Sequence, residues 1–308
     1  MAPFSSVNRR VGRFSACRAS RNSHSRPVNA AEALAEGTAR LGAAGVESPG
    51  VDAEWLLAHV LDCPRPELLL QRNVQLTPEQ ADQWAELLAG REARIPLQHL
   101  LGTANFCGLE LAVNEHVLIP RPETELLAEA AWKMAGAMDA PRVVDIGTGS
   151  GCLAIAIAAN TPKAEVHALD ISPEALAEAR ANAERHKTLI TFHEGNACES
   201  LPGAPWQIIV SNPPYIPSAD LAELQPEVRN HDPALALDGG ADGLSIYRAI
   251  IPHALAALAV DGRLLLEVGD GQAPAVGEII AQHGGCVQEI VSDLNNIERI
   301  VIASRDES

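Results

Sequence analysis

Hydrophobic residues in the first third of the chain recur at helical spacing. Apolar side chains return every three or four positions over Ala30–Leu41 and again over Val51–Leu61, as amphipathic helices require. Thr77 followed by Pro78 indicates the start of a third helix, because threonine caps free backbone N–H groups and proline is tolerated in the first turn. We therefore expect residues 29–96 to fold as a small all-helical domain.

The pattern changes over residues 97–119. Apolar and polar residues alternate from Phe106 to Val113, and again at Val117 and Ile119, which is typical of strands with one buried face. We interpret this stretch as a β-hairpin that links the helical domain to the rest of the chain.

From residue 120 onward, short buried strands alternate with helices, beginning with a helix over Glu125–Ala137. Such alternation predicts the α/β class, here a doubly wound, Rossmann-like parallel sheet that spans residues 120–308. The last two strands have no helix between them, so we expect them to pair antiparallel. The seven strands are expected at residues 142–146, 165–169, 189–193, 207–211, 262–268, 286–291 and 297–303.

Residues 1–28 form a basic tail with six arginines, several serines and no acidic residue. Without apolar periodicity, this tail is expected to be disordered. The same composition is typical of an organelle transit peptide, and a start codon placed too far upstream would also produce it. We therefore predict a cytoplasmic protein, with an organelle as the alternative. A secretory signal is excluded because the tail has no apolar core.

The charge and the cysteines exclude several classes of function. The 308 residues carry 23 Lys and Arg against 40 Asp and Glu, a net charge of −17. Such a chain repels a phosphate backbone, so no binding to DNA is expected. No apolar run approaches the ~20 residues of a membrane span, so no membrane partner is expected. The six cysteines form no Cys-x-x-Cys pair, which predicts reduced thiols and no metal site.

A glycine-rich loop follows the first expected strand of the sheet. Glycines let the backbone turn sharply and approach a ligand closely. Asp170 ends the second strand, where a carboxylate can accept both hydroxyls of a ribose. The loop resembles the cofactor loop of class I S-adenosylmethionine-dependent methyltransferases, while a dinucleotide loop or a purely structural turn are the alternatives. Its residues are Asp145, Gly147, Thr148, Gly149, Ser150 and Gly151.

A second motif, Asn212-Pro213-Pro214-Tyr215, follows the fourth expected strand. Ligands bind beyond the carboxyl ends of the strands in open α/β sheets, so this motif should lie beside the glycine loop. The Asn212 side-chain oxygen and the Pro213 carbonyl can accept two hydrogen bonds, and Tyr215 offers a flat face. These groups suit a planar NH2 group. The motif resembles the signature of methyltransferases that act on exocyclic or amide nitrogen, and we assign catalysis to it without a general base.

A third motif, here called the linker motif, precedes the sheet and also stiffens the chain. Its residues are Pro120-Arg121-Pro122-Glu123-Thr124-Glu125. With the helical domain and Asn212–Tyr215, it makes the chain similar over about residues 30–304 to the release factor glutamine methyltransferase family. The resemblance implies methyl transfer from S-adenosyl-L-methionine to the N5 atom of the glutamine in the Gly-Gly-Gln motif of peptide-chain release factors. This reaction modulates translation termination.

The resemblance also implies that the helical domain of residues 29–96 recognises the substrate, and it implies roles for single residues. The glycine loop, Asp170 and Asn212 would contact the cofactor, and Asn212, Pro213, Pro214 and Tyr215 would hold the glutamine. Asn196 and Ala197 would lie beside the adenine, where relatives often have an aspartate and an aromatic residue. Asn196 can still accept from the adenine amino group, but Ala197 cannot stack. Two further departures are Cys107, in place of an aromatic residue, and Asn295-Asn296, where a glycine is common.

Two other functions fit parts of the sequence. An adenine-N6 nucleic-acid methyltransferase would share the chemistry of Asn212–Tyr215, but the acidic charge weighs against it. A catalytically silent binding scaffold is the other alternative, and the intact Asp145, glycine loop and Asn212 weigh against it.

Overall fold

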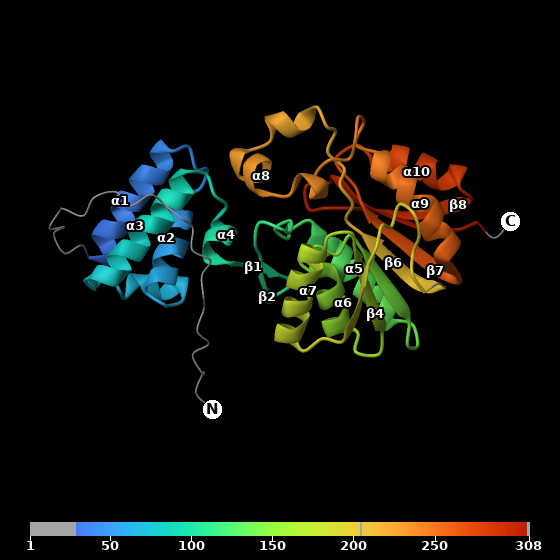
Figure 1. Cartoon of the computed structure of the whole chain (residues 1–308), viewed down its shortest axis with the longest axis horizontal. Coiled ribbons are helices and arrows are strands. Elements are labelled where there is room, and N and C mark those ends of the chain that lie inside the picture. The colour runs from blue at the N-terminus through green and yellow to red at the C-terminus, as the bar shows by residue number, and fades with distance from the viewer. Residues whose placement is uncertain (1–28, 204, 307–308) are drawn as a thin grey trace.

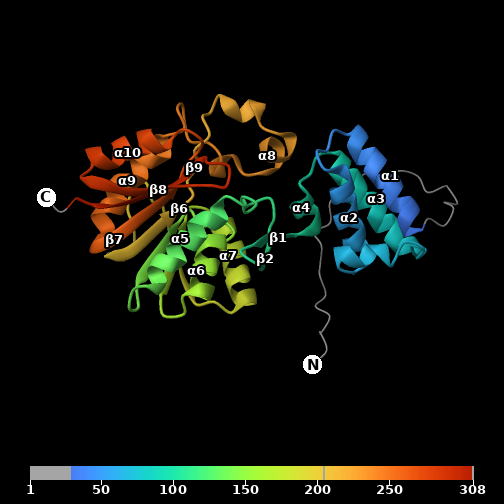
Figure 2. The ribbon, with the colours of Figure 1, turned by 180° about the vertical axis from the view of Figure 1, so that it is seen from behind.

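The computed structural model describes residues 29–203 and 205–306. A helical domain at one end of the molecule adjoins a larger α/β domain, here called the sheet domain (Figure 1, and from behind in Figure 2). The predicted disorder of residues 1–28 lies outside the described residues.

The helical domain forms at the predicted place. Asn29 and Thr77 each cap a helix in a reciprocal capping box, with Glu32 and Gln80 as their partners. Leu56 and Leu88 are fully buried in the core between the helices, and Trp84 packs with them. The elements are α1 (Ala30–Ala43), α2 (Pro49–Val60), the short 3-10 helix η1 (Arg65–Leu69), α3 (Pro78–Glu92) and α4 (Leu97–Leu101).

The linker differs in part from the prediction of a hairpin over residues 97–119. Its first residues form the helix α4, which begins after Pro96 and ends at Gly102, a glycine with φ of 71°. Leucines 97, 100 and 101 pack against the core of the helical domain, and this tertiary contact favours helix. The predicted strand at Val117 and Ile119 is also wrong, because these side chains are buried in a small cluster without strand pairing.

The hairpin itself consists of β1 (Thr103–Phe106) and β2 (Leu109–Ala112), paired antiparallel. Cys107 and Gly108 form its two-residue turn, with φ of 51° and 76°. Positive φ at both central residues gives a turn that matches the natural twist of two strands. Cys107 therefore serves as a turn residue here.

The sheet domain has the predicted α/β topology. Its strand order is β5-β4-β3-β6-β7-β9-β8, in which the first five strands are parallel and β9 is antiparallel to both of its neighbours. This confirms the expected antiparallel pair at the end of the chain. The strands are β3 (Arg142–Ile146), β4 (Glu165–Asp170), β5 (Ile190–Glu194), β6 (Trp206–Ser211), β7 (Leu258–Glu267), β8 (Gly285–Ser292) and β9 (Glu298–Arg305).

Helices cover both faces of the sheet, and each face has its own hydrophobic core. Val143 of β3 points to the core under α5 (Thr124–Gly136) and α6 (Cys152–Asn160), beside which α7 (Pro173–His186) packs. Val144 points to the opposite core under α9 (Ser245–Ala257) and α10 (Ala273–Gln282). Burial on both faces explains why these strands are almost continuously apolar.

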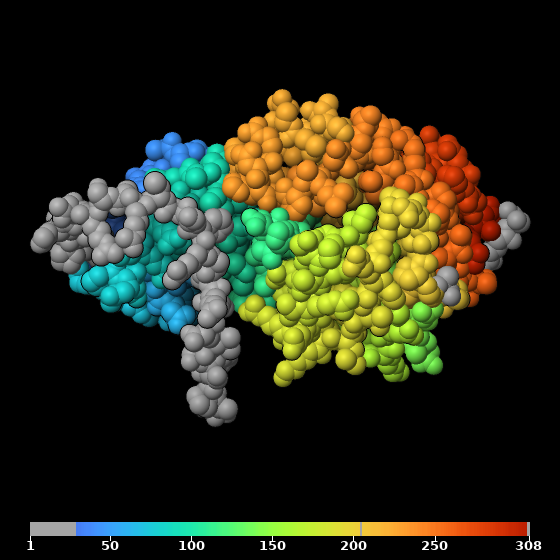
Figure 3. All heavy atoms as spheres, in the orientation of Figure 1, coloured from blue at the N-terminus to red at the C-terminus, as the bar shows by residue number. Residues whose placement is uncertain are grey.

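A long segment between β6 and α9, residues 216–240, is here called the strap. It contains η2 (Asp220–Glu223), α8 (Pro226–His231) and η3 (Ala234–Ala236). Its two ends are fastened together, since Ile216 N donates to Leu237 O and Gly239 N donates to Ile216 O. The strap extends toward the helical domain in orange, and its surface adjoins that domain in the space-filling view (Figure 3).

Candidate functional site

The strand order reverses between β3 and β6, and this point of the sheet brings the two predicted loops together. Ile146 and Ser211, the last residues of β3 and β6, are paired in register. Ser211 Oγ also donates to the Ile146 carbonyl at 2.8 Å. The glycine loop and Asn212–Tyr215 therefore leave the sheet side by side, where open α/β sheets form their ligand crevice.

The glycine loop requires glycine at its three alternating positions. Gly147, Gly149 and Gly151 have φ of 69°, 53° and 82°, which side chains rarely adopt. A Cβ atom added at Gly147 or Gly149 would meet no atom within 4 Å, whereas one at Gly151 would lie 3.0 Å from Ile155. The first two glycines thus border open space that a ligand can approach, and Gly151 allows close packing of α6.

The buried side chain of Asp145 connects the glycine loop to the start of α6 by hydrogen bonds. Its side chain is fully buried, and its Oδ2 atom accepts from Thr148 Oγ1 at 2.6 Å and from Ala154 N at 3.2 Å. Burial raises the pKa of Asp145 to about 7. The Thr148 and Ser150 side chains are also buried. Asp145 and Thr148 thus stabilise the loop through their mutual hydrogen bond, and a direct contact of any of these side chains with a cofactor stays a prediction.

Asp170 ends β4 beside the glycine loop, as predicted. Its Oδ2 atom accepts from Gly149 N at 2.8 Å and its Oδ1 atom from Ser172 N at 2.9 Å. A carboxylate oxygen can accept two hydrogen bonds, so each oxygen keeps capacity for one more donor. The carboxylate is thus oriented by the backbone and still able to accept from a ribose.

Asn196 and Ala197 follow β5. Asn196 Oδ1 accepts from Cys198 N at 3.0 Å and its Nδ2 donates to Glu199, so the side chain is held within its own turn. Ala197 packs against the hydrophobic core under α9 and α10. A contact of either residue with adenine stays a prediction.

Asn212 is held by a residue that the sequence analysis placed in the stiff linker. Its Nδ2 atom donates to Thr124 Oγ1 at 3.1 Å, at the start of α5. Thr124 is 2% exposed, so this contact lies in the interior. Among the described residues, no group donates a hydrogen bond to Asn212 Oδ1. The side-chain oxygen is therefore available as an acceptor.

Tyr215 is fixed from both sides. Its backbone carbonyl accepts from Gln272 Nε2 at 2.9 Å, and its ring packs against the core under α9 and α10. Burial raises the pKa of Tyr215 to about 12, so the phenol is neutral at physiological pH. The ring is thus a rigid, uncharged wall.

A cavity of about 290 Å³ lies against Asn212. Its wall is formed by the linker motif with Leu118 just before it, by the Asn212–Tyr215 motif and the strap that directly follows it, and by one side chain from β9. The lining residues are Leu118, Arg121, Glu123, Asn212, Pro213, Tyr215, Ile216, Val228, Ala236, Leu237 and Arg299. A volume of this size suits a side chain inserted from a protein or peptide, rather than a whole large ligand.

A buried carboxyl group, Glu267, stands at the end of β7 beside this cavity wall. The residue is 2% exposed, and burial raises its pKa to about 7. Hydrogen bonding with the Thr124 and Asn212 side chains lowers the pKa of Glu267. Its Oε2 atom has no hydrogen-bond partner among the described residues.

Five residues of the site were not predicted from the sequence: Thr124, Arg121, Glu123, Arg299 and Glu267. The linker motif supplied a signal for the first three, but a motif alone does not show which way it faces. Glu267 could also have been found from the sequence, because this acidic residue directly follows three leucines at the end of its strand.

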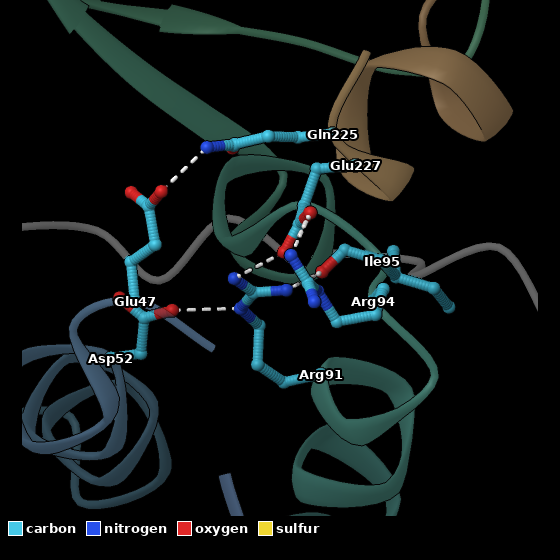
Figure 4. A network of polar contacts seen from close by, with 7 residues as sticks. All are labelled: Glu47, Asp52, Arg91, Arg94, Ile95, Gln225 and Glu227. Carbon is cyan, nitrogen blue, oxygen red and sulfur yellow. Dashed lines mark hydrogen bonds and ion pairs between the residues drawn. The ribbon is translucent and has the colours of Figure 1, made fainter. Parts of the chain in front are cut away.

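The strap is tied to the linker motif and to the helical domain. Arg121 Nη2 lies 2.5 Å from Asp232 Oδ2 at the end of α8. Glu227 forms ion pairs with Arg91 and Arg94 of the helical domain, at 2.8 and 2.6 Å (Figure 4). Burial by itself raises the pKa of Glu227, but hydrogen bonds from the two arginines outweigh it and hold the pKa at about 2.

Two further contacts extend this network, one within the helical domain and one between this domain and the strap. Arg91 Nε also donates to Asp52 Oδ2 at 2.7 Å, and Gln225 Nε2 donates to Glu47 at 2.6 Å (Figure 4). The helical domain thus fixes one side of the strap, and the strap forms one wall of the cavity.

Within the described part of the chain, no cluster of three or more His, Cys, Asp or Glu side chains could hold a metal ion. Five cysteines at positions 63, 107, 152, 198 and 286 are free thiols. In residues 29–203 and 205–306, no helix has both the length and the apolar character to cross a membrane.

Comparison with known proteins gives two family matches. Residues 32–102 match the PrmC N-terminal domain, and residues 123–224 match the methyltransferase small domain. The first match includes α4, in agreement with the packing of that helix on the helical domain.

Relatives of known name match most of the chain. The release factor glutamine methyltransferase of Geobacter sulfurreducens is 45% identical, over 83% of this chain and 90% of its own. The release factor glutamine methyltransferase of Deinococcus radiodurans is 44% identical, over 88% of this chain and 97% of its own. Among solved structures, the hMettl16 catalytic domain in complex with the MAT2A 3'UTR hairpin 6 has a TM-score of 0.53 at 18% identity, over 71% of this chain and 82% of its own, which shows a shared fold alone.

Proposed function

We propose, since the chain belongs to the release factor glutamine methyltransferase family, that it methylates the glutamine of the Gly-Gly-Gln motif in peptide-chain release factors. S-Adenosyl-L-methionine would donate the methyl group, and the side-chain N5 atom would receive it. One observation carries the proposal: the Asn212 amide is held by Thr124 beside a cavity of about 290 Å³, and its oxygen accepts no hydrogen bond from the described part of the chain.

The glycine loop and Asp170 form a cradle that fits an adenosine-containing sulfonium cofactor. Open space at Gly147 and Gly149 lets a ligand approach the backbone, and Asp170 offers acceptor capacity for ribose hydroxyls. In the proposal, the whole segment from Asp145 to Gly151 shapes this cradle, and Asn196 and Ala197 border the adenine. When bound, S-adenosylmethionine supplies an electrophilic methyl group on a positively charged sulfur.

The chemistry of the substrate explains the amide clamp. A carboxamide nitrogen is a poor nucleophile because its lone pair is delocalised into the carbonyl. Asn212 Oδ1 and the Pro213 carbonyl would accept its two N–H groups, and Pro214 and the Tyr215 ring would hold the plane of the amide. Positioning of this kind can contribute ~7–11 kcal/mol to catalysis in favourable cases.

The reaction needs no strong base before transfer. The glutamine nitrogen forms its bond to the methyl carbon while the carbon–sulfur bond breaks, and the nitrogen then carries one proton too many. That proton leaves to water after transfer. Attack on a sulfonium disperses charge, so the largely buried setting of Asn212 favours the step.

The proposed partner is a protein loop, and neither DNA nor a membrane is proposed as a partner. The strap lines the cavity and is joined to the helical domain by the ion pairs of Glu227 with Arg91 and Arg94, so these parts offer a Gly-Gly-Gln loop a protein surface beside the cavity. The net charge of −17 opposes binding to a nucleic-acid backbone. A cytoplasmic location belongs to this proposal, with an organelle as the alternative.

The test is a methylation assay with methyl-labelled S-adenosylmethionine and either a purified peptide-chain release factor or duplex DNA. We expect label in the tryptic peptide that contains Gly-Gly-Gln, located by mass spectrometry. A release factor with alanine in place of that glutamine is the matched control and should stay unlabelled. Label in DNA, or in neither substrate, would contradict the proposal.

A further inference from the structure

The carboxyl group of Glu267 has no part in the mechanism described so far, although it adjoins the amide clamp. It lies at the end of β7 and is 2% exposed. Ser211 and Leu266 are paired in register on the neighbouring parallel strands β6 and β7, so the residues that follow them, Asn212 and Glu267, lie side by side at the edge of the sheet. The Thr124 and Asn212 side chains lower the pKa of this carboxyl group, and its Oε2 atom has no hydrogen-bond partner among residues 29–203 and 205–306. A buried polar group with incomplete hydrogen bonding destabilises a fold, so its presence calls for a functional explanation.

We propose that the carboxylate of Glu267 is a positioning group that holds the Asn212 amide with its oxygen toward the cavity. This inference rests on the proposed function of the clamp. An ionised carboxylate can only accept hydrogen bonds, so the NH2 end of Asn212 has to face it. Thr124 Oγ1 accepts from the same NH2 group at 3.1 Å. With its NH2 end engaged, the Asn212 side chain presents Oδ1 to the substrate.

A neutral Glu267 would reverse this preference. Its O–H would donate, and the acceptor on Asn212 is the amide oxygen. The Thr124 hydroxyl can bond to the Asn212 amide in either orientation, because it can accept from the NH2 group or donate to the oxygen. The turned Asn212 would present N–H to the N–H groups of the glutamine, and no hydrogen bond forms between two donors. The charge of Glu267 therefore selects the orientation that binds substrate.

The groups around Glu267 explain where its charge changes. Burial is the largest influence and raises the pKa, as does the charge of Glu123, whereas Thr124, Arg299 and Asn212 lower it. The resulting pKa is about 7. The other titratable neighbours are two tyrosines and a cysteine whose own pKa values are raised, so they stay neutral near pH 7: Tyr215, Tyr247 and Cys152. The carboxylate form thus predominates above about pH 7, and the neutral form below it.

The first experiment measures kcat against pH for the full chain and for Glu267→Gln, with a release factor as substrate. For the wild type, we expect kcat to fall about tenfold from pH 8 to pH 6, as loss of one ionised group predicts. Glu267→Gln removes the titrating group but keeps an amide oxygen that accepts from Asn212, so its profile should be flat. If kcat of Glu267→Gln falls between pH 8 and pH 6 as much as kcat of the wild type, the proposal is overturned.

A second pair of variants keeps the proposal testable if Glu267→Gln does not fold. Thr124→Ser retains the hydroxyl, whereas Thr124→Val removes it at similar volume. We expect kcat within about threefold of the wild type for Thr124→Ser and about tenfold lower for Thr124→Val, with unchanged affinity for S-adenosylmethionine in both. Because the Thr124 hydroxyl lowers the pKa of Glu267, the fall in kcat toward acid pH should occur at higher pH in Thr124→Val than in Thr124→Ser. The same pH dependence of kcat in both variants would contradict the proposal.

A spectroscopic readout separates this inference from the proposed function. The side-chain amide signals of Asn212, assigned in ¹⁵N spectra by their absence in Asn212→Ala, should shift with a midpoint near pH 7 in the wild type and not in Glu267→Gln. This titration is independent of substrate. A release factor that stays unlabelled would refute the proposed function, whereas Asn212 signals that do not respond to Glu267 would refute the positioning role.

Discussion

The guanidinium of Arg91 on α3 forms an ion pair with the carboxylate of Glu227 on α8, with 2.8 Å between Nη2 and Oε1 (Figure 4). Both side chains are largely buried, at 7% and 13% exposure. The pair joins the helical domain to the strap, and the strap contributes a wall of the cavity. The shape of the proposed substrate site therefore depends on a contact between two domains.

Removing this carboxylate should loosen the domain contact. Glu227→Ala leaves Arg91 and Arg94 without their shared acceptor, and we expect the free energy of unfolding to fall by ~2 kcal/mol. The matched control is Asp242→Ala, which removes the partner of Arg248 in a pair that is about half exposed on both sides. That loss should stay below ~0.5 kcal/mol. Urea denaturation measures both values, and equal losses would contradict the structural role of Glu227.

Asn212→Ala should abolish most of the turnover. We expect kcat to fall by ~100-fold or more, because one acceptor that orients the substrate nitrogen is lost. Affinity for S-adenosylmethionine, measured by calorimetry, should change little. Asn295→Ala, an exposed asparagine in the turn between β8 and β9, should keep wild-type kcat. Wild-type turnover in Asn212→Ala would disprove the clamp.

Asp170→Ala should act on the cofactor instead. Loss of the ribose acceptor, and of the bond from Gly149 N, should raise the dissociation constant of S-adenosylmethionine by ~10-fold or more. Asp139→Ala removes an exposed carboxylate and should leave this constant unchanged. If both variants bind the cofactor alike, Asp170 has no role in its binding.

Asp145 should make stability depend on pH. Its pKa is about 7 in the folded chain, against an ordinary value of 3.8, so the fold favours the protonated form. This contribution to stability is complete below about pH 3.8 and is lost as the pH rises through about 7. Asp145→Asn does not titrate, so its stability relative to the wild type should increase by ~1–3 kcal/mol between pH 4 and pH 8. A difference that stays constant across this range would show that Asp145 titrates normally.

The sequence by itself determined the local elements and the class of fold. Asn29 and Thr77 each bind backbone N–H groups three residues ahead, so the helix starts could be located without any tertiary information. The apolar strands and the glycines of the loop were equally visible, because a continuous apolar run and a positive φ are set by residues close together in the chain.

Tertiary structure decided the contacts that turn these motifs into a site. Thr124 and Asn212 meet only after α5 packs against the sheet, and Arg91 meets Glu227 only when the strap reaches the helical domain. Residues 97–101 became a helix because their leucines found a core to pack against. Burial, and with it the raised pKa of Glu267, depends on atoms contributed by the whole fold, and neither periodicity nor spacing contains that information.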